Sequence, residues 1–217
     1  MKHRSSKKFL PLLTLFIVII AIFAVGFEIR KDRINNQTQQ QEQNEQQSKY
    51  AKAIEKEKKE KKAQKNFITK LSKPAMKSYN KNKQVLPSIV IAQAVLESDW
   101  GTSGLYLNAN NPFGIKGEYK GESIRYNTAE YENGKKVMVV ANFRKYPSLQ
   151  AAIDDHNYLI SKKFIKRTDL YSFRKQAYLI QKNAYATDPD YAKKVIGVIV
   201  KNNLREYDTE AINSYEE

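Results

Sequence analysis

A polar, charged tract divides this chain and confines any hydrophobic core to the residues that follow it. Residues 35–65, NNQTQQQEQNEQQSKYAKAIEKEKKEKKAQK, are rich in Gln, Glu and Lys and nearly free of large apolar side chains. A segment of this composition cannot bury enough apolar surface to fold alone. The chain has 217 residues, so what remains is enough for one folded domain of ordinary size, which we expect at residues 66–207.

An uncharged run of 19 residues, FLPLLTLFIVIIAIFAVGF at positions 9–27, precedes the polar tract. A helix of this length, rising about 1.5 Å per residue, covers nearly the ~30 Å of a bilayer core, so we expect a single transmembrane anchor. The basic residues 1–8 are expected in the cytoplasm and the remainder outside the cell. A cleaved signal peptide is the alternative, although its apolar core usually runs only about 7–15 residues.

Residues 28–65 are expected to form a polar stalk after this anchor. The first half of the polar tract is predicted to be a disordered spacer and the second half a solvated, charged helix. A membrane or wall-polymer partner that binds the basic stalk is an alternative to a simple spacer. Residues 208–217 are expected to form a C-terminal tail.

Charge and composition exclude several classes of function. The net charge is +15. Residues 1–64 contain 14 Lys and Arg against 7 Asp and Glu, and residues 65–217 contain 24 against 16. Both parts are therefore basic and suit binding to polyanions. An exported segment does not meet DNA, so we expect no nucleic-acid partner. The chain has no cysteine, and its two histidines, His3 and His156, lie far apart in sequence. These counts disfavour thiolate or Ser-His catalysis, and we expect no metal and no cofactor.

The pattern becomes globular from about residue 66 and predicts a mainly helical α+β domain. An almost wholly apolar helix, expected at residues 87–98, should be buried at the centre, with Pro87 at its start and Gly101 as its stop. Residues 105–121 are predicted to be irregular. The other expected elements are helices at 66–82, 148–160, 170–183 and 188–203, and strands at 123–132 and 135–146.

The two strands should form a β-hairpin, because Asn133-Gly134 is the strongest short-range hairpin signal. The pairing across this turn places Glu132 opposite Lys135 and Glu130 opposite Val137. Glu132 thus gains an ionic partner while Glu130 does not. Glu130 is therefore the better candidate for a functional carboxylate, and a solvated hairpin face is the alternative.

Glu97 is the main candidate for catalysis, because it closes the apolar helix in the stretch AQAVLESDWG. The helix C-terminus and the apolar surroundings both disfavour ionisation of its carboxyl group. A carboxylic acid that keeps its proton near neutral pH suits general-acid cleavage of a glycosidic bond. Gln93 lies one turn earlier on the same face, within reach of Glu97 or a ligand. The alternative for Glu97 is an ordinary ion pair or cap at a helix end.

Aromatic side chains near Glu97 are candidate platforms for sugar rings. Trp100 is the only tryptophan, and Tyr106 and Tyr126 lie on neighbouring predicted segments. Each of them taken singly fits a core position equally well, because large aromatic side chains tend to be buried.

Five stretches together resemble the peptidoglycan N-acetylglucosaminidases of glycoside hydrolase family 73, which include flagellar-rod and autolysin enzymes. The stretches are IAQAVLESDWGTS (91–103), NANNPFGIKG (108–117), TAEYENG (128–134), FRKYPSLQAAIDDH (143–156) and YATDPDYAKKV (185–195). The resemblance implies a lysozyme-like fold, in which helices meet a small β-hairpin lobe across a groove.

The same resemblance implies roles for individual residues. Glu97 matches the catalytic acid and Glu130 the second carboxylate, with Glu122 and Glu132 as alternatives for the latter. Tyr185 is expected to position the substrate, and Asn111 and Phe113 belong to a substrate-binding stretch, in which Pro112 replaces the family's leucine.

The function implied is a membrane-anchored endo-β-N-acetylglucosaminidase. The enzyme is expected to cleave the β-1,4 bond from N-acetylglucosamine to N-acetylmuramic acid. The expected partner is therefore the peptidoglycan strand. The residues do not decide whether cleavage is internal or terminal. They also do not decide whether the mechanism is inverting, retaining or substrate-assisted. A lytic transglycosylase or muramidase on the same fold, or a wall-binding scaffold without hydrolysis, are the alternatives.

Overall fold

The computed structural model describes residues 10–132, 135–166 and 170–214, and it describes side chains from Leu15 onward, except those of residues 129–132 and 135–136. The expected cytoplasmic residues 1–8 and the Asn133-Gly134 turn lie outside the described residues. The chain divides into two compact units, Met1–Glu60 and Lys61–Glu217. Helix α1 (Leu10–Asn82) contributes residues to both units.

The prediction of a disordered spacer in the first half of the polar tract is wrong, because residues 35–65 all lie within the helix α1. Their side chains are almost all exposed, so the helix here is not formed by burial of an apolar face. Gln, Glu, Lys and Ala are strong helix formers, and residues 35–65 contain neither glycine nor proline. The expected solvated helix in the second half of the tract is confirmed.

The expected membrane span at residues 9–27 is not confirmed. None of the helices in residues 10–132, 135–166 and 170–214 is long and apolar enough to cross a membrane. Residue 9 lies outside the described residues, and the described side chains begin only at Leu15.

The core of the second unit forms around α2 (Pro87–Glu97), as predicted. Every residue from Pro87 to Val95 is buried, because apolar side chains occupy all sides of the helix. Helices α5 (Phe173–Lys182), α6 (Tyr191–Lys201) and α7 (Arg205–Asn213) all contact it. The last turns of α1 add further apolar side chains to the same core: Phe67, Ile68, Leu71, Ala75 and Tyr79.

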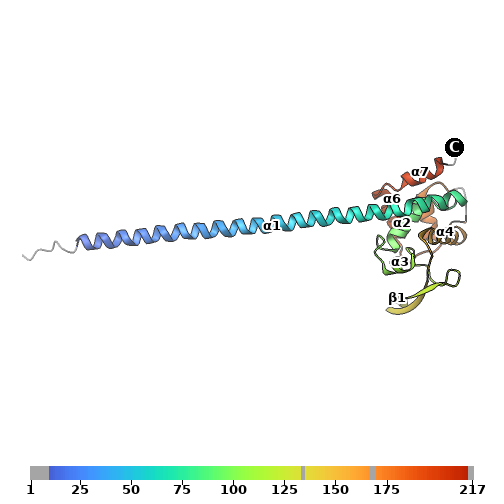
Figure 1. Cartoon of the computed structure of the whole chain (residues 1–217), viewed down its shortest axis with the longest axis horizontal. Coiled ribbons are helices and arrows are strands. Elements are labelled where there is room, and N and C mark those ends of the chain that lie inside the picture. The colour runs from blue at the N-terminus through green and yellow to red at the C-terminus, as the bar shows by residue number, and fades with distance from the viewer. Residues whose placement is uncertain (1–9, 133–134, 167–169, 215–217) are drawn as a thin grey trace, which may run out of the picture. The chain divides into compact units, whose positions relative to one another are not determined.

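The predicted hairpin is confirmed in type and in register. Strands β1 (Ser123–Glu132) and β2 (Lys135–Arg144) are antiparallel, with Glu130 paired to Val137 and Glu132 to Lys135. Along β2 the side chains alternate as expected, with Val139 half-buried, Val140 exposed and Phe143 buried. In Figure 1 the hairpin projects from the helical part of the second unit beside α3 (Gly104–Ala109), a short helix within a stretch predicted to be irregular.

Helix α4 (Leu149–Ile160) and α5 begin where serine side chains cap them. Ser148 accepts a hydrogen bond from the Ala151 amide, and Ser172 accepts one from the Lys175 amide. Because Ser172 is the cap, α5 starts at Phe173, three residues later than the predicted start at residue 170. A π-helix, η1 (Ser161–Ile165), follows α4 directly and ends at Lys166, which has a positive φ of 54°. This π-helix was not predicted from the sequence, because so short a widened turn has no distinct hydrophobic period.

Helix α7 stabilises the start of the buried helix α2. The Asp208 carboxylate accepts hydrogen bonds from the Ser88 amide at 2.8 Å and from the Ser88 hydroxyl at 2.7 Å. Leu86, at the N-cap position of α2, has no side chain that can cap, so an acceptor 120 residues away satisfies the helix end instead. Helix α7 thereby extends the packed unit beyond residue 207.

Replacing Asp208 by asparagine is expected to flatten the pH dependence of stability. Burial raises the pKa of Asp208 to about 6, although the bonds from Ser88 oppose the rise. The folded state thus holds this proton more tightly than the unfolded state, so the contribution to stability is full below about pH 4 and is lost as the pH rises through about 6. Thermal melts of both proteins from pH 4 to 7 measure this difference. A Glu210→Gln variant, changed on an exposed position of the same helix, is the control, and an unchanged pH slope in Asp208→Asn would contradict the assignment.

Candidate active site

Glu97 is held at the end of α2 by a tight turn that follows it. The Ser98 hydroxyl donates to the Ala94 carbonyl at 2.6 Å and accepts from the Gly101 amide at 2.9 Å. Asp99, Trp100 and Gly101 all have positive φ, so the helix cannot continue. A Cβ atom on Gly101 would also lie 2.4 Å from the Phe67 ring, so this position requires glycine. The turn fixes Glu97 at the edge of the core.

A cavity of about 340 Å³ opens beside Glu97. Its walls come from the end of α2, residues 113–115, the second half of α4, η1 and residues 185–186. Apolar and aromatic side chains dominate the lining, among them Phe113, Phe164 and Tyr185. Small-molecule sites usually have about 300–1,000 Å³ and few polar groups, so this cavity has the size and character of a site for one or two sugar rings.

A chain of hydrogen bonds orients the Glu97 carboxyl group. The Gln93 amide Nε2 donates to the Tyr191 hydroxyl at 3.0 Å, and that hydroxyl donates to Glu97 Oε1, also at 3.0 Å. With Oε1 engaged, Oε2 is the oxygen left to exchange a proton with a ligand. The predicted proximity of Gln93 to Glu97 is thus achieved through Tyr191, which was not among the site residues expected from the sequence. A sequence signal existed, since Tyr191 lies in the YATDPDY stretch.

The pKa of Glu97 is raised, in the direction predicted. Loss of solvent around the carboxyl group is the larger cause, and the hydrogen bond from Tyr191 opposes it. Glu97 is exposed and lines the cavity, yet the protein around it restricts hydration of the carboxyl group. A partly desolvated acid with one open face can hold a proton and still reach a ligand.

Replacing Tyr191 by phenylalanine is expected to raise the pKa of Glu97 further and to lower turnover about tenfold, because the carboxyl group loses an orienting bond worth roughly 1.5–3 kcal/mol. The alkaline limb of the pH–rate profile should therefore move to higher pH. Rates on purified peptidoglycan between pH 4 and 9 measure both effects. Tyr178→Phe, on an exposed position of α5, is the control; an unmoved alkaline limb in Tyr191→Phe would rule out this role.

Tyr185 lines the cavity, and its role in positioning substrate stays a prediction. Its ring lies 5.4 Å from that of Tyr191 and meets Phe164 edge-on at 5.2 Å, measured between centroids. Burial and the nearby Glu97 carboxylate raise the pKa of Tyr185, so its hydroxyl stays protonated. The ring is held as a fixed wall of the cavity.

Phe113 also lines the cavity and stacks on His156, with ring centroids 3.9 Å apart and planes inclined by 17°. His156 is buried, and burial lowers its pKa to about 4, so the imidazole is neutral at physiological pH. Its Nδ1 lies 3.1 Å from the Asn157 side-chain oxygen, which requires the proton to be on Nδ1. His156 therefore supports the Phe113 wall as a neutral ring.

Asn111 organises the loop that presents Phe113. Its side-chain nitrogen donates to the carbonyls of Ile115 and Arg144, and its oxygen accepts from the amides of Phe113 and Ile115. The side chain is buried and its polar atoms are engaged by the backbone. This placement makes Asn111 a scaffold for the cavity wall, and its expected part in substrate binding stays a prediction.

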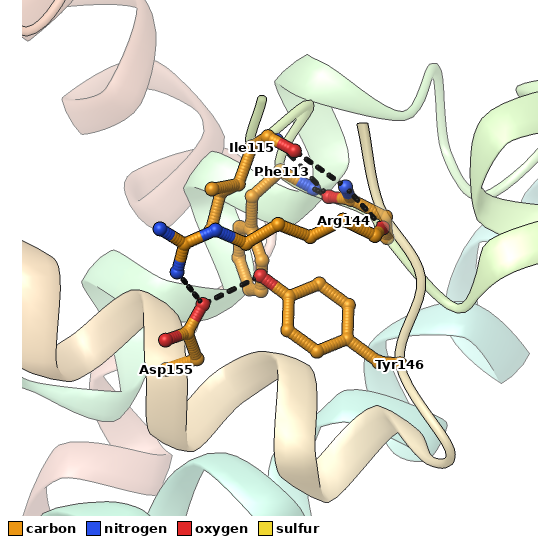
Figure 2. A network of polar contacts seen from close by, with 6 residues as sticks. Phe113, Ile115, Arg144, Tyr146 and Asp155 are labelled. Atoms are coloured by element: carbon orange, nitrogen blue, oxygen red, sulfur yellow. Dashed lines mark hydrogen bonds and ion pairs between the residues drawn. The ribbon is translucent and has the colours of Figure 1, made fainter. Parts of the chain in front are cut away.

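The same loop is joined to helix α4 by a polar network (Figure 2). Arg144 Nη1 and the Tyr146 hydroxyl both point to Asp155 Oδ2, each at 2.6 Å. Arg144 ends β2, and Asp155 precedes His156 on α4, so the network fixes the base of the hairpin relative to the cavity.

Two predicted aromatic platforms lie elsewhere. Trp100 is half-buried against the core and does not line the cavity. The Tyr126 hydroxyl packs on Gly104 and accepts a bond from Asn108 at 3.3 Å, which joins β1 to α3. Substrate contacts for both remain predictions. The side chain of Glu130 lies outside the described residues, so its role also stays a prediction.

No group of three His, Cys, Asp or Glu side chains suited to a metal ion occurs among the described residues. The lining of the cavity is mostly aromatic and apolar, and Glu97 is the acid at its edge.

The chain resembles proteins that act on bacterial cell walls. Residues 73–204 match the glucosaminidase family, described as mannosyl-glycoprotein endo-β-N-acetylglucosaminidase. Exo-glucosaminidase LytG from Bacillus subtilis is 44% identical over 152 residues, which cover 67% of this chain and 54% of LytG. The chain therefore spans about half the length of this relative, and it covers a quarter or less of the next two curated relatives.

Solved structures show the same similarity. The catalytic domain of the autolysin Auto from Listeria monocytogenes matches with a TM-score of 0.62 and 36% identity, covering 67% of this chain and 88% of that domain. The truncated glycoside hydrolase domain of Salmonella typhimurium FlgJ matches with a TM-score of 0.54 and 33% identity, covering 65% of this chain and 98% of that domain. By sequence and by fold, this chain belongs to the glucosaminidase family of glycoside hydrolases, glycoside hydrolase family 73.

Proposed function

We propose that this protein hydrolyses the β-1,4 bond from N-acetylglucosamine to N-acetylmuramic acid in peptidoglycan. The observation that carries the proposal is a carboxyl group with a raised pKa, Glu97, at the edge of a cavity lined by Phe113, Phe164 and Tyr185. Aromatic walls suit the apolar faces of sugar rings, and a protonated acid beside them suits cleavage of a glycosidic bond.

In this reaction Glu97 donates its proton to the glycosidic oxygen as the bond to the sugar carbon breaks. The departing muramic acid leaves with a hydroxyl group at C4, and positive charge develops on the N-acetylglucosamine ring. Tyr191 holds Oε1 throughout, so proton transfer proceeds from Oε2. A water molecule then bonds to the ring carbon and loses a proton, with Glu130 either accepting that proton or stabilising the ring charge. In a third route the acetamido oxygen of the substrate attacks the ring carbon first, and water then opens the cyclic intermediate.

The chemical identity of the new reducing end tests the proposal. Purified peptidoglycan is digested with the full chain, and the fragments are reduced and analysed by mass spectrometry. Reducing-end N-acetylglucosamine is the expected product. Reducing muramic acid would instead indicate a muramidase, anhydromuramic acid a lytic transglycosylase, and binding without fragments a scaffold. Fragment lengths early in digestion separate internal cleavage, which we expect, from stepwise terminal cleavage.

We also propose that residues 9–27 tether the protein to the membrane with the catalytic domain facing the wall. The support is the 19-residue uncharged run, about 28 Å long as a helix. The full chain should remain in the membrane fraction after alkaline washing, whereas a chain lacking residues 1–27 should not. Release of the full chain by the wash would refute the tether.

A further inference from the structure

Lys163 is a charged residue of the cavity for which the reaction described above has no use. It lines the cavity together with Glu97, and these two are the charged side chains among the lining residues. Lys163 is exposed, and no ion pair or hydrogen bond of its ammonium group is seen among the described residues. Elsewhere, lysines close to carboxylates pair with them, as Lys81 does with Asp154 at 2.7 Å and Lys193 with Asp190 at 2.8 Å.

The backbone that carries Lys163 is unusual. Helix α4 widens into the π-helix η1, which places both Lys163 and Phe164 in the cavity wall. The neighbouring Lys162 is not part of that wall, and its ammonium group lies over the Tyr158 ring, 5.9 Å from the centroid. Single π-helical turns inside α-helices are rare and occur often at functional sites. The widened turn thus presents one of two adjacent lysines to the cavity.

The substrate carries an acidic group close to the bond that Glu97 would cleave. The scissile oxygen is O4 of muramic acid, and the adjacent O3 bears a lactyl ether that ends in a carboxyl group. When a stem peptide is attached, this carboxyl group is an amide and has no charge. When the peptide has been removed, it is a free carboxylate. A cation in the same cavity as Glu97 lies where it can distinguish these two states.

We propose that Lys163 binds the free lactyl carboxylate of the leaving muramic acid, so that the protein prefers glycan strands from which the stem peptide has been removed. This inference rests on the proposed function. The ammonium group can donate a hydrogen bond to either form, but only the free carboxylate adds the attraction between opposite charges. The reaction that supplies this substrate is hydrolysis of the amide bond between the lactyl group and the stem peptide.

The test compares cleavage of two soluble oligosaccharides by the full chain. Both have alternating N-acetylglucosamine and N-acetylmuramic acid; one has free lactyl carboxylates and the other has them converted to neutral N-methylamides. The measured quantity is the ratio of kcat/KM for the carboxylate to that for the methylamide. For the unaltered protein we expect a ratio of about ten at low salt, falling as salt screens the charges.

Three variants locate the preference. Lys163→Gln should bring the ratio close to one, and Lys163→Arg should retain most of it. Lys162→Gln, changed one residue away on the same turn, should keep the full ratio. Because each position is exposed, circular dichroism should show all three folded.

The outcomes separate this inference from the proposed function. A ratio near one in the unaltered protein, or an unchanged ratio in Lys163→Gln, overturns the role of Lys163 while glucosaminidase activity stands. Failure of the unaltered protein to cleave either oligosaccharide, with reducing-end N-acetylglucosamine also missing from peptidoglycan digests, overturns both.

Discussion

Replacing Glu97 by glutamine is expected to lower the rate of peptidoglycan hydrolysis by about 10²–10⁴-fold, the usual contribution of a general acid. Glutamine keeps the size of the side chain and can still accept the bond from Tyr191, but it has no proton to donate to the sugar oxygen. Because Glu97 lies at an exposed helix end beside the cavity, the variant should fold and still bind peptidoglycan. Release of soluble fragments and pulldown by insoluble peptidoglycan measure the two properties separately.

The rate of hydrolysis by the unaltered protein is expected to depend on pH through the protonation of Glu97. A general acid works only while protonated, so the rate should fall as the pH rises through the pKa of Glu97. Because desolvation raises that pKa, with Tyr191 opposing, the protonated form persists to higher pH than in an ordinary glutamate. The alkaline limb should be missing from any residual activity of Glu97→Gln. Glu118→Gln, on an exposed loop position, is the control. A folded Glu97→Gln protein with most of its activity would remove Glu97 from catalysis.

Replacing Glu130 by glutamine is expected to lower turnover by about 10²-fold, at the low end of the range for a catalytic acid or base. The loss follows if the carboxylate activates water or stabilises charge on the sugar ring, since a neutral amide does neither. Initial rates on peptidoglycan measure the effect, with binding measured in parallel. An effect on binding alone would indicate contact with the substrate instead of chemistry.

The hairpin offers a matched control for this variant. Glu132 lies two residues further along β1, so it shares a strand face with Glu130, and it pairs with Lys135. Glu132→Gln should therefore leave turnover close to that of the unaltered protein. Normal turnover in Glu130→Gln together with a loss in Glu132→Gln would exchange the two assignments, and normal turnover in both would exclude this strand from the mechanism.

Local sequence signals predicted the hairpin with the correct pairing. A two-residue Asn-Gly turn fixes which residues face each other, so naming the turn was enough to pair Glu130 with Val137. The alternation of apolar and polar residues then fixed the buried face. Helix α2 was equally predictable, because Pro87 starts it and the turn ending at Gly101 stops it.

Amino-acid composition predicted ordered and disordered segments less well than the local turn and helix signals predicted the hairpin and α2. Residues 35–50 were expected to be disordered because they bury nothing, yet good helix formers without a breaker remain helical. Helix α7 was assigned partly to a tail because its apolar positions are few; its contribution is Asp208, whose partner Ser88 lies 120 residues away.

What the sequence by itself determined was the family, the central helix ending in Glu97 and the hairpin carrying Glu130, because each can be recognised from short stretches of consecutive residues. Only the tertiary structure decided what surrounds Glu97. Tyr191 reaches it across 94 residues because α6 packs on α2, and Phe113 and Lys163 meet it at one cavity because a loop and a π-helix converge there. Periodicity reports which face of an element is buried. The partner that covers that face depends on the packing of the whole core.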